Sequence, residues 1–70
     1  MIGKIKQIVR DRYYGFVSIG GEGRYLEFFF HATNAPGFEQ LQRGDPVEFW
    51  LDDDPYRNGL RAVDVRRIEP

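Results

Sequence analysis

The sequence contains no cysteine, one histidine and one serine. Without thiolates there is no disulfide framework and no thiolate metal site, and His31 alone is too little for a metal centre. The acidic run at residues 52–54 lacks the alternating spacing, central glycine and distal glutamate of a calcium loop. Ser18 has no base near it in the pattern. We therefore expect no catalytic residue, no bound metal, no cofactor and no enzymatic activity.

Long apolar runs are also missing. Residues 1–6 lack the apolar core of a signal peptide, and no segment approaches the about 20 apolar residues of a membrane-spanning helix. Together with the lack of cysteine, this favours a cytoplasmic protein with no membrane partner. The length of 70 residues predicts a single domain over residues 1–70. We expect a monomer, with strand exchange between two copies as the route to a dimer.

Aromatic residues, in contrast, are plentiful. Six Phe, four Tyr and one Trp make up 16% of the chain, and so small a core cannot hide them all. The net charge of −1 argues against a generally basic nucleic-acid binder. Its distribution is uneven, however, because residues 1–31 sum to +2 and residues 32–70 to −3. Aromatic rings next to a locally positive segment favour binding of single-stranded nucleic acid. We expect this binding to be weak and sensitive to salt.

Gly and Pro divide the chain into five segments with strand character. Alternation and β-forming residues predict strands over residues 5–10, 14–19, 25–31, 46–51 and 60–68. The imperfect alternation of the first segment indicates a bulge or strong coiling. Residues 20–23 are predicted to form a turn, and residues 32–45 a long loop with room for one short helical turn. These features predict an all-β fold, a five-stranded antiparallel Greek-key barrel of the OB type.

Four ring-bearing residues are predicted to share one sheet surface. Tyr14 and Phe16 lie on one face of their strand, and Phe29 and His31 on one face of the next, because successive side chains alternate. The alternative is that these rings form the core. The residues of opposite parity are apolar enough to fill the core instead, which favours a ligand-binding role for the four rings. These opposite residues are Val17, Phe28 and Phe30.

Six short motifs extend this pattern over residues 3–68. They are Gly3-Lys4-Ile5-Lys6, Tyr14-Gly15-Phe16-Val17, Phe28-Phe29-Phe30-His31, Gly37-Phe38-Glu39-Gln40-Leu41, Gly44-Asp45-Pro46-Val47-Glu48-Phe49 and Ala62-Val63-Asp64-Val65. In order and spacing the chain resembles the bacterial cold-shock proteins. The resemblance implies an OB-type barrel that binds single-stranded RNA and DNA through motifs similar to RNP1 and RNP2. It also implies a role as an RNA chaperone or a regulator of transcription or translation.

The resemblance implies a binding site of eight residues. They comprise two phosphate contacts, two RNP1 rings, two RNP2 residues, one stacking ring in a loop and one basic loop residue near the ligand. In that order they are Lys6 and Arg12, Tyr14 and Phe16, Phe29 and His31, Phe38, and Arg57.

Two aromatic positions of the family are not aromatic here. Gln7 stands where the family usually has tryptophan, and Ala32 where an aromatic often follows the RNP2 histidine. At ~1–3 kcal/mol per stacked base, two lost platforms weaken binding by about 2–6 kcal/mol unless another ring compensates. Tyr13, where the family has glycine, either supplies such a ring or packs on the loop. Tyr25 and Trp50 are further candidates, although Trp50 is expected to face outward on the fourth strand, away from the RNP motifs.

The lost platforms and the acidic total leave open an alternative of another class. The chain would then be an OB-type protein-interaction module with weakened or lost nucleic-acid binding. Trp50 and Tyr25 would mark its protein or dimer interface. Salt dependence distinguishes the two, because single-strand binding weakens with a log–log slope near −0.7 per phosphate contact.

Overall fold

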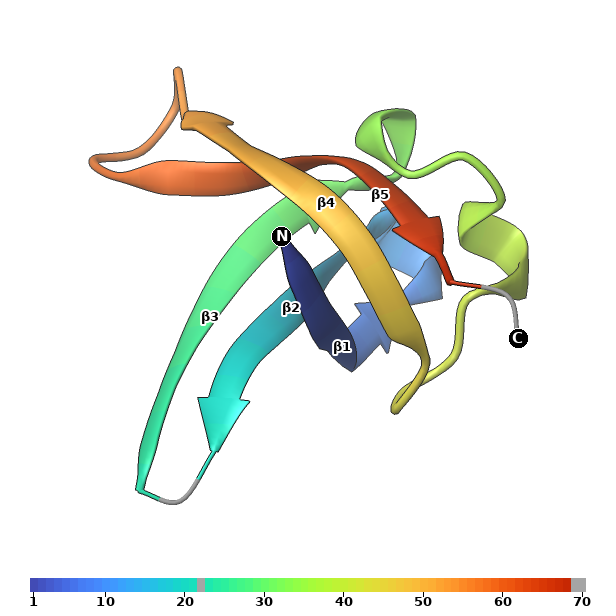
Figure 1. Ribbon diagram of the computed structural model, residues 1–70. Helices are drawn as coiled ribbons and strands as arrows, with labels where there is room; N and C mark the ends of the chain where they lie inside the picture. The colour runs from blue at the N-terminus through green and yellow to red at the C-terminus, as the bar shows by residue number, and fades with distance from the viewer. Residues whose placement is uncertain (22, 69–70) are drawn as a thin grey trace.

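The computed structural model describes residues 1–21 and 23–68. Within them the chain forms strands and short 3₁₀ helices only, as Figure 1 shows. None of the described helices has the length and apolar character needed to cross a membrane. The strands are β1 (Ile2–Val9), β2 (Tyr14–Gly21), β3 (Arg24–His31), β4 (Pro46–Asp53) and β5 (Leu60–Arg67). The 3₁₀ helices are η1 (Arg10–Arg12), η2 (Ala32–Asn34) and η3 (Phe38–Gln40).

The five strands form one antiparallel sheet in the order β3-β2-β1-β4-β5. The C-terminal part of β1 pairs with β2 and its N-terminal part pairs with β4, so β1 joins the β2–β3 hairpin to the β4–β5 hairpin (Figure 1). The outer strands β3 and β5 also contact each other, which curls the sheet round its core. The predicted all-β fold of five antiparallel strands is therefore confirmed.

The irregular alternation of the first strand corresponds to a break in its register. Ile5 is opposite Val17, and Gln7 is opposite the next residue of β2, Phe16. Lys6 is therefore the extra residue of a β-bulge, as the sequence pattern indicated. The predicted turn at residues 20–23 is shorter in the structure, because β2 extends through Gly21, which pairs with Arg24 of β3. Glu22 lies outside the described residues.

The core is built from the inward-facing residues of all five strands. Val17 and Phe30 are completely buried, and Phe28 is half-buried with its ring centroid 6.4 Å from that of Phe49. The prediction that the opposite-parity residues of β2 and β3 fill the core is confirmed. The buried apolar residues are Ile5, Val17, Phe30, Ala35, Phe38, Leu41, Val47, Phe49, Ala62 and Val65.

Gly15 is required by close packing on β2. A Cβ atom added there would lie 2.6 Å from the Gln7 carbonyl oxygen and 2.8 Å from Cζ of Phe30. Both distances are far below van der Waals contact. The glycine between Tyr14 and Phe16 thus lets β1 and the Phe30 ring approach the inner side of β2 while two rings stand on its outer side.

The loop after β3 differs from the prediction. It contains two 3₁₀ helices, η2 and η3, rather than a single helical turn. Gly37 separates them in a left-handed conformation with φ 77°, which is open to glycine at no steric cost. The chain then turns Phe38 inward, where its side chain is 7% exposed and its ring centroid lies 6.1 Å from that of Phe30. Phe38 is therefore a core residue. This differs from the expectation that its ring is exposed in the loop for stacking on a base.

Candidate nucleic-acid interface

Three rings lie together on the outer side of the β2–β3 hairpin. Phe16 is directly opposite Phe29 in the register, and Tyr14 is opposite His31. The Tyr14 and Phe29 ring centroids are 5.4 Å apart, and Phe16 lies 5.9 Å from Tyr14 and 6.0 Å from Phe29. All four residues are half-buried. We call Tyr14, Phe16, Phe29 and His31 the aromatic face. Aromatic side chains grouped on a sheet surface are the kind of feature on which unpaired bases stack in RNA-binding proteins.

His31 is held in place by the helix that follows it. Its Nδ1 accepts a hydrogen bond from the Thr33 backbone N–H at 3.2 Å and lies 3.1 Å from Thr33 Oγ1. An Nδ1 that accepts places the proton of the neutral ring on Nε2. The imidazole therefore has a fixed orientation and keeps one N–H donor for a ligand.

Arg57 reaches the aromatic face from the loop between β4 and β5. Its guanidinium carbon lies 4.1 Å from the centroid of the Phe29 ring, a cation–π contact. Phe29 and Arg57 come from segments that are far apart in the sequence. Arg57 thus lies next to the strand that carries the RNP2-like motif. Its contact with a ligand stays a prediction.

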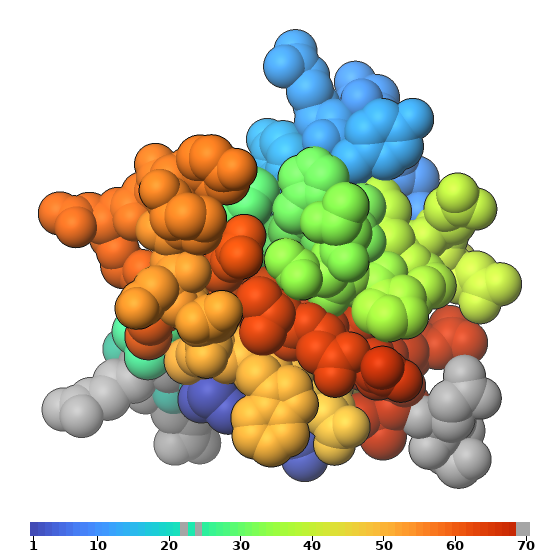
Figure 2. Space-filling model, turned by 90° about the horizontal axis from the view of Figure 1, so that it is seen from above, coloured from blue at the N-terminus to red at the C-terminus, as the bar shows by residue number. Residues whose placement is uncertain are grey.

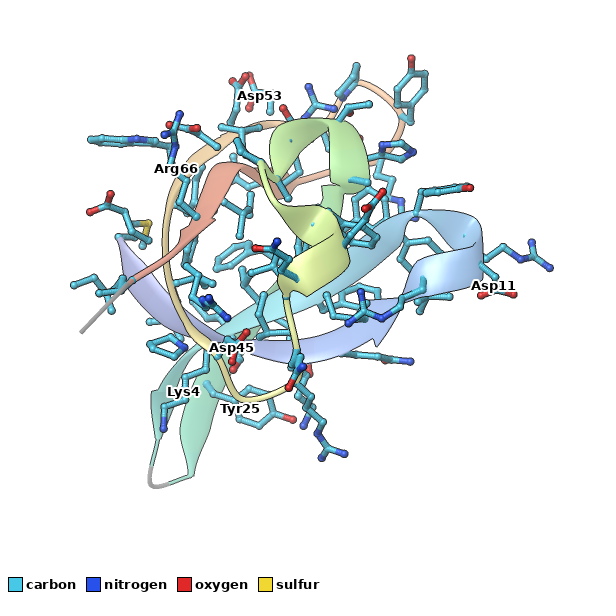
Figure 3. All side chains as sticks on the ribbon, turned by 90° about the vertical axis from the view of Figure 1, so that its right-hand side faces the viewer. Lys4, Asp11, Tyr25, Asp45, Asp53 and Arg66 are labelled. Carbon is cyan, nitrogen blue, oxygen red and sulfur yellow. The ribbon has the colours of Figure 1, made fainter. Side chains whose placement is uncertain are left out.

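Lys6 and Tyr25 extend the aromatic face toward the tip of the hairpin. The Lys6 ammonium lies 5.3 Å from the Tyr25 ring centroid and 3.9 Å from Glu27 Oε1. Gly20 stands opposite Tyr25 on β2 and has no side chain, so the ring has space to extend across β2 toward β1. The Tyr25 side chain is 57% exposed, and it lies with Lys4 near this hairpin in Figure 3.

Tyr13 lies between the exposed Arg12 of η1 and Tyr14, the first residue of β2. Its backbone is left-handed, with φ 61° and ψ 38°, which costs a non-glycine residue roughly 1–2 kcal/mol. The Ala32 backbone N–H donates to the Tyr13 carbonyl oxygen at 2.8 Å. The Tyr13 side chain is 62% exposed. A ring is therefore available beside Ala32, where the family often has its own.

A hollow of about 530 Å³ separates η1 from the loop around η3. Tyr13, Ala32 and Phe38 contribute to its wall. Arg10 spans it, donating from its guanidinium to the Glu39 carbonyl oxygen at 2.9 Å and to the Leu41 carbonyl oxygen. The sequence grouped Arg10 with the positive residues near the rings. In the structure its hydrogen bonds connect η1 to the loop around η3.

The fold thus gathers most of the predicted site. Tyr14, Phe16 and Phe29 are in mutual contact, and Arg57 contacts Phe29. His31 is opposite Tyr14 in the register. Lys6 lies on β1, next to β2, and Arg12 ends η1 two residues before Tyr14. Phe38 is the exception. Arg61 was not singled out from the sequence, and it lines a cavity against Phe29 and His31. Nothing in the local pattern around Arg61 signals this position.

Comparison with known proteins gives a consistent result. Residues 1–68 match the profile of the family described as 'Cold-shock' DNA-binding domain. The chain is 31% identical over 67 residues to the "Major cold shock protein" of Micrococcus luteus, covering 96% of this chain and 97% of that one. It is 35% identical over 66 residues to the "Cold shock-like protein CspA" of Stigmatella aurantiaca, covering 94% of each.

Proposed function

The chain belongs to the 'Cold-shock' DNA-binding domain family, and from this membership we propose that it binds single-stranded RNA and DNA with low sequence specificity. The family relationship supports nucleic-acid binding in general. The proposed mode is stacking of bases on the aromatic face, with phosphates contacted by Lys6, Arg12 and Arg57. Stacking tolerates any sequence because every base has a π-face.

The arrangement of Tyr14, Phe16 and Phe29 is the observation that carries this proposal. Their ring centroids lie within 6.0 Å of one another, and all three side chains are half-buried. Hydrophobic residues of opposite parity already fill the core. The three rings are therefore not needed inside, and their partial exposure matches a surface for bases.

The proposed action is that of an RNA chaperone or a regulator of transcription or translation. Bases that stack on the protein cannot pair with one another, so weak RNA secondary structure opens as the protein binds. This competition needs no cofactor and no energy source. It requires only that many weak contacts form along one strand, which the row of rings and flanking cations supports.

Tyr13 and Tyr25 are proposed to replace the two lost stacking platforms. Tyr13 is hydrogen-bonded through its backbone to Ala32, one of the two altered positions. The second altered position is Gln7. Tyr25 lies against Lys6, which precedes Gln7 in the sequence. Each replacement restores about 1–3 kcal/mol per stacked base. The full loss of about 2–6 kcal/mol for two missing platforms then applies only if neither tyrosine contacts the strand.

The alternative, a protein-interaction module, is favoured by one observation. Trp50 on β4 is 63% exposed, and Ile2 on the neighbouring β1 is also exposed. The prediction that Trp50 faces outward is confirmed. Since β4 pairs with neither β2 nor β3, a partner at Trp50 would leave the aromatic face uncovered.

Titration with short oligouridine and oligothymidine strands at several salt concentrations tests the proposal. Three phosphate contacts predict a log–log salt slope of about −2. Substitution Trp50→Ala is the matched control, and it should leave strand affinity unchanged. An absence of binding at millimolar strand and low salt would refute the nucleic-acid proposal and direct attention to a protein partner at Trp50.

A further inference from the structure

A second cavity, of about 400 Å³, opens at the end of the aromatic face. Its volume falls in the range of about 300–1,000 Å³ that is usual for small-ligand sites. Figure 2 shows the loop 54–59, in orange, and η2, in green, on either side of the first residues of β5. The residues of this cavity that enter the argument are Phe29, His31, Thr33, Asp54, Arg57 and Arg61.

Arg61 is one of the residues that line this cavity. Its side chain is half-buried, and its Nε is fully buried with no hydrogen-bond partner within the described part of the chain. A buried Nε is out of reach of a ligand, which leaves the two terminal Nη groups as the donors that a base can use. The Nη1 and Nη2 groups of an arginine form a planar pair of parallel donors, which fits two neighbouring acceptor atoms.

Asp54 supplies the complementary chemistry. It is only 8% exposed, and its Oδ1 accepts from the Tyr56 backbone N–H at 2.9 Å. A phosphate can use Arg57 and Arg61 of this cavity but is repelled by the Asp54 carboxylate, whereas a base can use all three side chains. A carboxylate does accept hydrogen bonds from the N–H groups of a base. The cavity therefore combines stacking rings, a donor pair and an acceptor.

We propose that this cavity reads one guanine in the bound strand, an inference that rests on the proposed function. The guanine ring stacks beside Phe29 and His31. Arg61 donates to its O6 and N7, and Asp54 accepts from its N1–H and N2–H groups. Guanine alone places two acceptors side by side on one edge and two donors on the next. Adenine pairs an acceptor with a donor where Arg61 needs two acceptors.

The resulting preference applies to a single position. Elsewhere along the aromatic face, stacking and phosphate contacts tolerate any base. Binding is thus of low specificity overall, with one guanine setting the register of the strand.

The test uses oligouridine strands that differ only at one central nucleotide, which is uridine, cytidine, adenosine or guanosine. Wild-type protein should bind the guanosine strand about tenfold more tightly, as one bidentate base contact provides. Replacing that guanosine by 7-deazaguanosine, which lacks N7, should remove most of the preference without any change in the protein. Substitution Arg61→Gln should abolish the preference, and Arg61→Lys should reduce it because an ammonium lacks the planar donor pair. Both should change affinity for oligouridine less than twofold.

Substitution Arg66→Gln is the matched control. Arg66 is also on β5, but its Nε is paired with Asp64 Oδ1 at 2.8 Å, and Figure 3 shows it away from the hairpin that carries Tyr25. The guanine preference should survive this change. Equal affinity for the four strands would overturn the guanine site and leave the proposed function standing. Failure of every strand to bind would refute the proposed function itself. A preference that persists in both Arg61 variants would overturn the role of Arg61.

Discussion

Arg57 covers Phe29, with its guanidinium carbon 4.1 Å from the centroid of the ring. A base that stacks on Phe29 has to displace this guanidinium or stack on its outer plane. In both cases the charge of Arg57 stays beside the base, within reach of the adjoining phosphate. The ring proposed to stack a base and the cation proposed to contact a phosphate are therefore adjacent.

Substitution Arg57→Gln should reduce the magnitude of the log–log salt slope by about 0.7, because one phosphate contact is removed. Affinity should fall most at low salt. Arg57→Lys, which keeps the charge, is the control and should retain the slope. The measurement is strand affinity at four or more salt concentrations. An unchanged slope in Arg57→Gln would show that Arg57 meets no phosphate.

Substitutions Phe16→Ala and Phe29→Ala should each weaken strand binding by about 1–3 kcal/mol, the contribution of one stacked base. Both rings are half-buried on the outer side of the hairpin, so the protein should remain folded. Binding is measured by titration, and folding by thermal unfolding of the same samples. If both variants keep wild-type affinity while folded, bases do not stack on the aromatic face.

Substitution Tyr13→Gly should have effects of opposite sign on stability and binding. Glycine removes the strain of the left-handed conformation, which is roughly 1–2 kcal/mol. The greater backbone entropy of glycine in the unfolded chain offsets about 0.5–1 kcal/mol of this gain. The free energy of unfolding should therefore rise by about 0.5–1 kcal/mol. Strand affinity should fall by about 1 kcal/mol, because the ring beside Ala32 is lost. A gain in stability with no loss of affinity would mean that Tyr13 only packs on the loop.

Substitution Gly15→Ala should lower the free energy of unfolding by about 1–3 kcal/mol, because the new Cβ collides with the Gln7 carbonyl and the Phe30 ring. For a domain of this size the midpoint of thermal unfolding should fall by roughly 4–24 °C. Gly21→Ala is the matched control on the same strand, since a Cβ there meets nothing within 4 Å. Equal stability of the two variants would contradict the close packing described for Gly15.

Substitution Phe38→Leu should leave strand affinity unchanged and lower stability by about 1 kcal/mol or more. Phe38 is 7% exposed and packs edge-on against Phe30, so it contributes to the core and not to the stacking surface. The two readouts are strand titration and thermal unfolding. A loss of affinity without a loss of stability would show that the ring leaves the core to stack a base.

The strands and the aromatic face could be predicted because they depend on local alternation. Tyr14, Phe16 and Phe29 share a face as a direct consequence of the two-residue period of a strand. The imperfect alternation of the first strand indicated a bulge or strong coiling, and the register places the bulge at Lys6. The outward position of Trp50 was implied by the family resemblance.

The remaining features depend on contacts that no local pattern encodes. The direction of Phe38 is set by the left-handed turn at Gly37 and by space beside Phe30. The contact of Arg57 with Phe29 depends on where the β4–β5 loop meets β3. The burial of Arg61 Nε depends on how the curled sheet brings β5 against β3. Each is a tertiary relationship between distant segments.

The first measurement should follow backbone amide and aromatic side-chain NMR signals of the wild-type protein during titration with a short oligouridine strand at low salt. Shifts should concentrate at Tyr14, Phe16, Phe29 and His31, and the indole signal of Trp50 should stay in place. This pattern would establish the aromatic face as the strand-binding surface. Shifts centred on Trp50, or none at millimolar strand, would contradict it.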